Sequence, residues 1–273
     1  MLDRVHFISG LPRSGSTLLA AILRQNPRFR TDITGPVAQL CRLVHQTICG
    51  TGEFAILFND ERRAQMLRGI FDTYYAEVQP GTVVFDTNRS WTGRAALLGK
   101  LYPQCRIICC VREIGWILDS LERMRLKNPL KLSKLFTYRG SDSIYTRVDE
   151  LMHSENGLVG GAWSNLREAW FSDSAQRLIL VPYSSLTEDP QSTLRRLYTE
   201  LGEPYFEHDF GNVSYDAREY DDHLGMPGLH EVRRVVECRP RQPVIPPEIF
   251  NKYARSQFWK DPGLNPRGVT RLD

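Results

Sequence analysis

The feature that most constrains this chain is a glycine-containing loop between a strand-like run and a helix-like run near the N-terminus. The loop has the sequence Gly-Leu-Pro-Arg-Ser-Gly-Ser-Thr over residues 10–17. Residues 5–9 before it are apolar and β-rich, which is typical of a buried strand in a parallel sheet. Residues 18–23 after it favour a helix. This order directs the N–H groups of the loop and the positive end of the helix dipole at one point, where an anion binds well.

The residues of the loop differ from the pattern that binds nucleoside triphosphates. That pattern is G-x-x-x-x-G-K-[ST], in which the lysine contacts the terminal phosphates and the hydroxyl holds magnesium. Here the glycine spacing is kept, but Ser16 replaces the lysine and a cation appears earlier, at Arg13. Gly15 lets the backbone approach a ligand closely, while Ser14, Ser16 and Thr17 offer hydroxyl donors. We interpret the loop as a site for a phosphate-like anion; the alternative is an ordinary turn.

Composition places the chain among globular proteins. Its 273 residues allow a substantial core, and 41% hydrophobic and 25% charged residues are ordinary values. A net charge of +3 without a dense basic run argues against nucleic acid as the main partner. No apolar stretch approaches the roughly 20 residues of a membrane span, and the early first strand leaves no room for a signal peptide. The six cysteines look like reduced residues, so we expect a cytoplasmic protein.

Strand-like and helical segments alternate along the rest of the chain. Further strands are predicted over residues 82–85, 106–111 and 178–181, and helices over residues 60–78, 95–101, 114–124 and 190–201. Alternation of this kind predicts an α/β fold of three layers, with a central parallel sheet flanked by helices. We expect one domain over residues 1–273, with its core at about 4–202 and a C-terminal extension over 203–273 that wraps the core. Residues 127–161 mix basic, polar and glycine residues and are expected to form a substrate lid.

Residues 12–19, Pro-Arg-Ser-Gly-Ser-Thr-Leu-Leu, resemble the 5′-phosphosulfate-binding loop of sulfotransferases. These enzymes use 3′-phosphoadenosine-5′-phosphosulfate (PAPS) on a P-loop-related α/β fold, with serine or threonine at the lysine position. In the family, an arginine after a later strand and a serine eight residues on bind the 3′-phosphate; Arg112 and Ser120 match this pair. The match is physically consistent, because ligands of open α/β sheets bind beyond the carboxyl ends of the strands. The alternative for Arg112 is a surface arginine at a strand end.

Further similarities are closest to the bacterial and protein-tyrosine branch of the family. Residues 101–103, Leu-Tyr-Pro, resemble that branch's approach to the 3′-phosphate site. Tyr183 resembles a tyrosine that contacts the nucleotide, and Arg241 resembles a C-terminal basic residue that reaches the phosphates. The resemblance therefore implies that PAPS, and its product adenosine 3′,5′-bisphosphate (PAP), bind to Arg13, Ser14, Gly15, Ser16, Thr17, Arg112, Ser120, Tyr183 and Arg241.

The resemblance also implies in-line transfer of a sulfuryl group to a hydroxyl or amine. Such a reaction depends on positioning and on stabilising the charge that develops on oxygen. Arg13 is the first candidate for that stabilisation, assisted by Ser16 and Thr17. The sequence contains no obvious cluster of metal ligands, so we expect no metal in the reaction.

The general base departs from the family pattern. Tyrosine-sulfating enzymes carry a glutamate after the loop helix, whereas the aligned stretch here offers only Asp32, for which a turn carboxylate is the alternative. The family lysine after the second strand is also missing. Asp86 and Arg89, which follow the predicted strand 82–85, are candidates for the base and for the missing cation. The alternative is a strand-end turn with an internal Asp–Arg pair and Trp91 in the core.

Two other functions are compatible with parts of this pattern. A P-loop kinase or NTPase with an altered loop is disfavoured by the serine at position 16. A non-catalytic PAPS- or PAP-binding protein would have kept the donor motifs and lost the acceptor machinery. For an enzyme, the acceptor is expected to be a small molecule, a carbohydrate or a peptide, and a homo-oligomer is compatible with the sequence.

Overall fold

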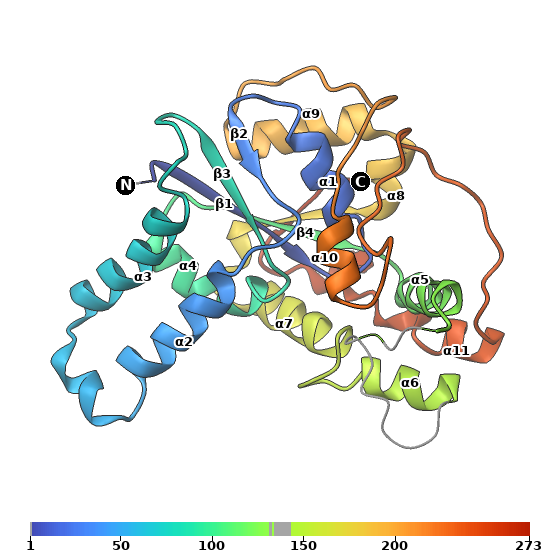
Figure 1. The fold of residues 1–273 in the computed structure, drawn as a ribbon, viewed down its shortest axis with the longest axis horizontal. Helices are drawn as coiled ribbons and strands as arrows, with labels where there is room; N and C mark the ends of the chain where they lie inside the picture. The colour runs from blue at the N-terminus through green and yellow to red at the C-terminus, as the bar shows by residue number, and fades with distance from the viewer. Residues whose placement is uncertain (1, 131–132, 134–142) are drawn as a thin grey trace.

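Six parallel strands form the central sheet, in the order β2-β3-β1-β4-β5-β6 (Figure 1). The computed structural model describes residues 2–130, 133 and 143–273. The strands are β1 (Arg4–Gly10), β2 (Phe29–Thr31), β3 (Val83–Thr87), β4 (Ile107–Val111), β5 (Leu178–Pro182) and β6 (Thr270–Arg271). The chain builds β2 and β3 on one side of β1 and then crosses to β4 on the other side. Open α/β sheets bind ligands at such a reversal, beyond the carboxyl ends of the strands.

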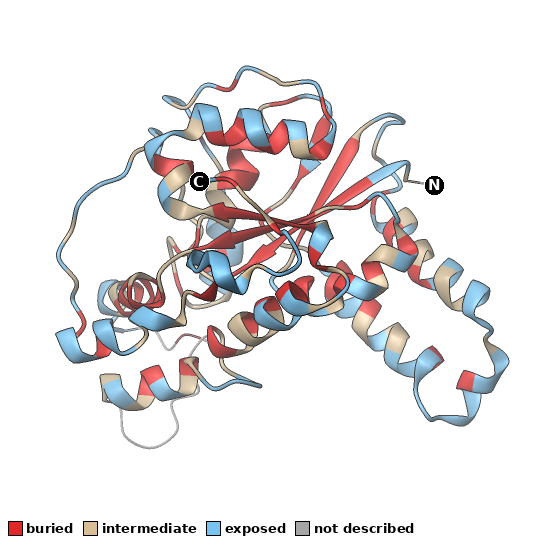
Figure 2. Ribbon diagram, turned by 180° about the vertical axis from the view of Figure 1, so that it is seen from behind, coloured by how far each residue is buried: buried red, intermediate tan, exposed pale blue. Residues whose placement is uncertain are grey.

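Helices cover both faces of the sheet, so that the strands are buried between two layers (Figure 2). The helices are α1 (Ser16–Leu23), α2 (Val37–Cys49), α3 (Asp60–Tyr74), α4 (Ala95–Leu101), α5 (Ile114–Lys127), α6 (Ile144–Leu151), α7 (Gly160–Phe171), α8 (Tyr183–Glu188), α9 (Pro190–Leu201), α10 (Arg218–His223) and α11 (Pro247–Lys252). Side chains alternate along each strand, so Phe7 joins the core under α2, α3, α4, α5 and α7, whereas Ile8 joins the core under α1, α8 and α9. The predicted three-layer α/β fold is confirmed.

The predicted strands and helices match the observed ones to within a few residues at their ends. The start of α9 could be predicted because its capping residues are typical. The side chain of Asp189 accepts a hydrogen bond of 3.1 Å from the N–H of Ser192, and Pro190 is the first residue of the helix. Strands β2 and β6 were not predicted. They contain three and two residues, which is too short for alternation to be recognised.

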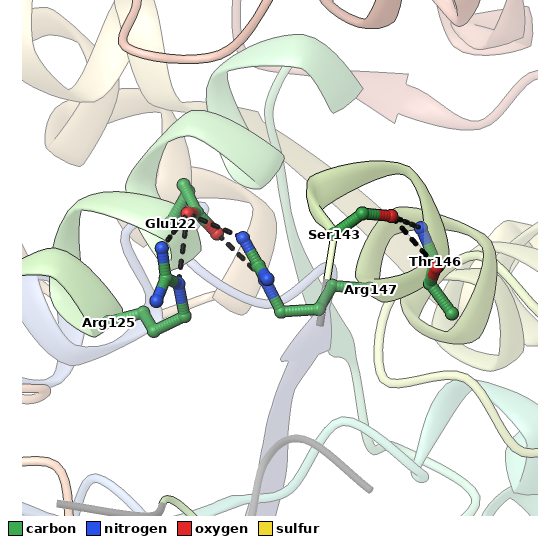
Figure 3. Close-up of polar contacts among 5 residues, drawn as sticks. All are labelled: Glu122, Arg125, Ser143, Thr146 and Arg147. Carbon is green, nitrogen blue, oxygen red and sulfur yellow. Dashed lines mark hydrogen bonds and ion pairs between the residues drawn. The ribbon is translucent and has the colours of Figure 1, made fainter. Parts of the chain in front are cut away.

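The predicted lid, residues 127–161, is only partly described. Residues 131–132 and 134–142 lie outside the described residues, while α6 and the first turn of α7 occupy its second half. A buried carboxylate fixes α6 to α5, because Glu122 on α5 accepts a hydrogen bond of 2.8 Å from Arg147 on α6 (Figure 3). Arg125, on the same helix as Glu122, donates to the same carboxylate at 2.7 Å. The helix that follows the undescribed segment is thereby attached to the helix that follows β4.

The C-terminal extension packs against the core at several separate places. Met226, Leu229 and Ile249 lie in the core cluster on the α5 and α7 face, and β6 adds an edge strand to β5. Within the described part of the chain, no helix combines the length and the apolar character needed to cross a bilayer.

Candidate active site

The loop between β1 and α1 has a constrained backbone. Gly10 (φ 99°), Arg13 (φ 56°) and Gly15 (φ 95°) are all in the left-handed region, and Arg13 is the one non-glycine residue to be so among residues 2–130, 133 and 143–273. A Cβ on Gly10 would lie 2.3 Å from the carbonyl oxygen of Cys110 on β4, so the close approach of the loop to β4 requires glycine. A left-handed arginine costs about 1–3 kcal/mol and persists only where other contacts hold it.

The start of α1 presents backbone N–H groups without protein acceptors. The helix begins at Ser16 with no side-chain cap, and in the described chain the N–H groups of residues 14–17 donate to no protein acceptor. The hydroxyl of Ser14 does not join them, because it is fully buried and donates to the carbonyl of Pro12 at 3.3 Å. Ser16 and Thr17 are half-buried at the helix start. Unpaired donors at the positive end of a helix form a cradle that fits a phosphate or sulfate group.

Three different segments hold Arg13. Its Nε donates to Oγ of Ser120 on α5 at 3.1 Å, and its Nη1 donates to the carbonyl oxygen of Leu229. Its own carbonyl accepts a hydrogen bond of 3.4 Å from Nη1 of Arg112. Burial, followed by the charge of Arg112, lowers the pKa of Arg13 to about 10, so it stays protonated at neutral pH. The two predicted phosphate motifs therefore meet at this arginine.

Tyr183 links the loop to Arg112. The Arg112 guanidinium stacks over the Tyr183 ring, with 4.0 Å between its Cζ and the ring centroid. A Cβ on Gly15 would lie 3.0 Å from Cδ2 of the same ring. Tyr183 is the first residue of α8, directly after β5. The structure thus brings Arg13, Arg112, Ser120 and Tyr183 together at the carboxyl ends of β1, β4 and β5.

Arg241 lies at the border of this cluster and has a carboxylate partner. Its Nη2 lies 2.7 Å from Oδ2 of Asp119, and its Cζ lies 5.2 Å from the centroid of the Trp116 ring. Asp119 is buried and also pairs with Arg123 at 3.0 Å. The charge of Arg241 lowers the pKa of Arg112, after the larger effect of burial. Arg241 therefore adds to the positive potential of the site from its edge.

Asp86 lies in the core, where both of its carboxylate oxygens have donors. Oδ2 accepts from the Tyr75 hydroxyl at 2.7 Å, and Oδ1 accepts from Nε1 of Trp91 at 2.7 Å. Asp86 is 1% exposed and Trp91 is fully buried. Desolvation raises the pKa of Asp86 against the effect of the two hydrogen bonds. This placement favours the structural role over that of the base.

The alternative interpretation included an internal ion pair between Asp86 and Arg89, but the carboxylate oxygens of Asp86 are paired with Tyr75 and Trp91 instead. Arg89 is exposed beyond β3, where it is close enough to Tyr220 and His230 to interact with both electrostatically. Asp32, the other carboxylate considered as a base, pairs with Arg30 at 3.0 Å.

A loop from the C-terminal extension, residues 210–236, lies against the phosphate cradle. Two backbone hydrogen bonds close its base, from the N–H of Val236 to Phe210 at 2.9 Å and from the N–H of Val213 to Arg234 at 2.7 Å. The loop contains α10, which lies in front of the carboxyl end of β1 (Figure 1). Its contact with the cradle is the hydrogen bond from Arg13 to Leu229.

Within the 210–236 loop, Asp221 and His230 form a pair that the sequence analysis missed. Oδ1 of Asp221 lies 2.5 Å from Nδ1 of His230, and Oδ2 accepts the backbone N–H of the same residue at 2.8 Å. The only sequence signal is a histidine nine residues after an aspartate in a glycine-containing segment. Nothing local connects that segment to the phosphate loop, because the Arg13–Leu229 contact spans 216 residues.

Metal ligands do not gather in the described part of the molecule. Over residues 2–130, 133 and 143–273, no group of three or more His, Cys, Asp or Glu side chains is arranged to hold an ion. The charges at the site come from arginines instead.

Comparisons with known proteins match this chain in sequence and in fold. The profile described as "Sulfotransferase family" matches residues 6–207. No curated protein sequence matches the chain. A solved sulfotransferase from Alicyclobacillus acidocaldarius is 14% identical, with a TM-score of 0.52 over 82% of this chain and 90% of that one, and supports the fold. The sulfotransferase domain of the Synechococcus PCC 7002 olefin synthase is 18% identical (TM-score 0.49; 93% and 94% covered). Mouse sulfotransferase SULT7A1 complexed with PAP is 13% identical (TM-score 0.49; 92% and 78% covered).

Proposed function

The chain belongs to the sulfotransferase family and is a sulfotransferase, and from that premise we propose that its donor is PAPS and its acceptor a hydroxyl or amine of a small molecule, carbohydrate or peptide. PAPS carries an activated sulfuryl group on its 5′-phosphate and a second phosphate on its 3′-oxygen. A site for it therefore needs two anion-binding places at a fixed separation.

The observation that carries the proposal is the hydrogen bond of 3.1 Å between Arg13 Nε and Ser120 Oγ. It joins the loop after β1 to the helix after β4, so that the two phosphate motifs form one continuous surface. The free N–H groups of residues 14–17 fit the 5′-phosphosulfate, with Ser16 and Thr17 beside them. Arg112 and Ser120 would hold the 3′-phosphate.

Positive charge at the site matches an anionic donor. Arg13 and Arg112 are both half-buried, and neither pairs with a carboxylate in the described chain. Burial lowers the pKa of both guanidinium groups, and the charge of Arg112 lowers that of Arg13 further, but both groups stay protonated at pH 7. Arg13 is positioned to stabilise charge on the sulfuryl oxygens, and we expect no requirement for magnesium.

The compartment is a further part of the proposal. All six cysteines are unpaired, three of them buried in strand β4 or directly before it. Unpaired cysteines are typical of a reducing compartment, so we propose a cytoplasmic enzyme of the bacterial type.

Calorimetric titration tests the donor. PAP should bind in the presence of EDTA, whereas ATP with magnesium should give no heat of binding. Binding of ATP–magnesium without binding of PAP would overturn the proposal and favour a nucleoside-triphosphate site.

A further inference from the structure

We propose that His230, oriented by Asp221, is the general base that takes the proton from the acceptor hydroxyl. This assignment rests on the proposed function, because it requires a sulfuryl donor held at the cradle. It names a residue for a role that the buried hydrogen bonds of Asp86 and the ion pair of Asp32 with Arg30 disfavour for those two carboxylates.

The contacts of Asp221 fix the orientation and the tautomer of the imidazole. Asp221 has 3% side-chain exposure, and its two oxygens bind the backbone N–H and Nδ1 of His230 at 2.8 and 2.5 Å. A carboxylate can only accept, so Nδ1 carries the proton and Nε2 is the acceptor. Among the described residues, Nε2 has no hydrogen-bond partner, and the side chain is 18% exposed. The free lone pair is thus accessible.

The 210–236 loop brings this imidazole to the reacting end of the site. Leu229, the residue before His230, accepts the hydrogen bond from Arg13. The buried side chains of Met226 and Leu229 anchor the turn in the core, and its backbone is closed by the hydrogen bond of 3.0 Å from Met226 to Asp221. His230 is therefore one residue from a direct contact with the arginine that we assign to the sulfuryl group.

Charges facing His230 come from three segments. Asp221 belongs to the same loop, Arg13 to the phosphate loop and Arg89 to the turn after β3, while the Tyr220 ring lies 5.5 Å away. Burial and then the two arginines lower the pKa of His230 against the raising effect of Asp221, and the net shift is downward. The imidazole is consequently neutral at pH 7, as a general base must be.

The proton and electron movements balance with these groups. Nε2 of His230 takes the proton of the acceptor O–H while the acceptor oxygen forms its bond to sulfur. The bond between sulfur and the 5′-phosphate oxygen breaks, and its electron pair stays on that phosphate, which leaves as part of PAP. Asp221 stabilises the imidazolium, which returns its proton to solvent after the product leaves.

The test combines turnover, binding and tautomer state. With PAPS as donor and water as acceptor, wild-type sulfate release is compared with that of His230→Gln and Asp221→Asn. We expect His230→Gln to lose about 10²- to 10⁴-fold in rate, with the Kd for PAP and the melting temperature nearly unchanged. The wild-type rate should fall as the pH is lowered and His230 becomes protonated. The residual rate of His230→Gln should not show this dependence on pH. His153→Gln, at an exposed histidine, is the matched control and should behave like wild type.

Nitrogen-15 NMR tests the tautomer of the His230 imidazole independently of turnover. Wild-type His230 should show the Nδ1–H tautomer, identified by its absence in His230→Gln and its loss in Asp221→Asn. An Nε2–H tautomer, or a His230→Gln rate within about threefold of wild type, overturns the assignment of the base. A wild-type chain that neither binds PAP nor releases sulfate from PAPS overturns the proposed function instead.

Discussion

Replacing Arg112 by alanine tests whether the second phosphate motif recognises the 3′-phosphate. In the structure its guanidinium stacks on Tyr183 at 4.0 Å and donates one long hydrogen bond, of 3.4 Å, to the Arg13 carbonyl. Arg13 also donates a hydrogen bond of 3.1 Å to Ser120, and Arg112 takes no part in that contact. The substitution should therefore leave the 5′ side of the cradle in place.

The expected loss follows from the contact that is removed. A hydrogen bond to a charged group contributes about 1.5–3 kcal/mol, and a bidentate arginine–phosphate contact lies at the upper end. Arg112 already stacks on Tyr183 in the absence of ligand. The stacking therefore orients the guanidinium before binding and adds no further loss of affinity of its own. A loss of about 2–3 kcal/mol corresponds to about 30- to 150-fold weaker binding of PAP. The affinity of Arg112→Lys for PAP should fall between those of the wild type and Arg112→Ala, because lysine keeps the charge but lacks the planar guanidinium that can make two hydrogen bonds.

Calorimetry with two ligands provides the readout. PAP contains the 3′-phosphate and adenosine 5′-phosphosulfate lacks it, so Arg112→Ala should weaken PAP strongly and adenosine 5′-phosphosulfate by less than about threefold. Arg195→Ala is the matched control, because Arg195 stacks on Tyr205 at 4.1 Å outside the cluster. Equal losses for the two ligands would refute the assignment of Arg112 to the 3′-phosphate.

Four further substitutions test the cradle, the core and the pH dependence of stability. Gly15→Ala should weaken PAP about tenfold, measured by calorimetry, because it strains a φ of 95° and pushes a Cβ to 3.0 Å from the Tyr183 ring. Asp86→Ala should lower the free energy of unfolding, measured in urea, by about 2–6 kcal/mol, because it leaves two buried donors unpaired. Tyr75→Phe removes only one hydrogen bond and should lower that free energy by less. An Asp86→Ala protein that is stable but has no turnover would support the aspartate as the base. His208 is buried, and burial lowers its pKa to about 4. As the pH falls below 6.5, this imidazole is protonated in the unfolded chain before it is protonated in the folded one. The free energy of unfolding should therefore drop by about 3 kcal/mol by pH 4. In His208→Asn, the urea midpoint should depend less on pH between 6.5 and 4 than it does in the wild type. An unchanged pH dependence would exclude this imidazole as the cause.

Local patterns in the sequence were sufficient for the four longer strands of the sheet, β1, β3, β4 and β5, and for the loop between β1 and α1. The spacing of Gly10 and Gly15 reflects two backbone requirements, a close approach to β4 and a left-handed residue before α1, and both are met within one short segment. Arg112 and Ser120 were identified instead by their resemblance to the family's 3′-phosphate pair, and in the structure each of them contacts Arg13.

Side-chain direction and distant contacts were not legible in the same way. The hydroxyl of Ser14 belongs to a binding loop by sequence, yet it turns inward to a carbonyl. Asp86 lies near the end of β3, close to the site, but its two oxygens accept hydrogen bonds from Tyr75, directly after α3, and from Trp91. His230 depends on a loop whose contact with Arg13 spans 216 residues, and no periodicity encodes such a contact.

The backbone of Arg13 connects these observations. A non-glycine residue at φ 56° is unfavourable by itself, so the fold must hold it there. Ser120, Arg112 and Leu229 supply that restraint from α5, the end of β4 and the 210–236 loop. An arginine fixed before its ligand arrives loses little freedom on binding and needs little reorganisation as charge develops on the transferring group. Because the Leu229 contact also sets the position of His230, the segment that completes the cradle is the same one that presents the proposed base. If His230 is the base, as we propose, Arg13 couples cofactor binding to proton removal, and shifting the 210–236 loop should impair both together.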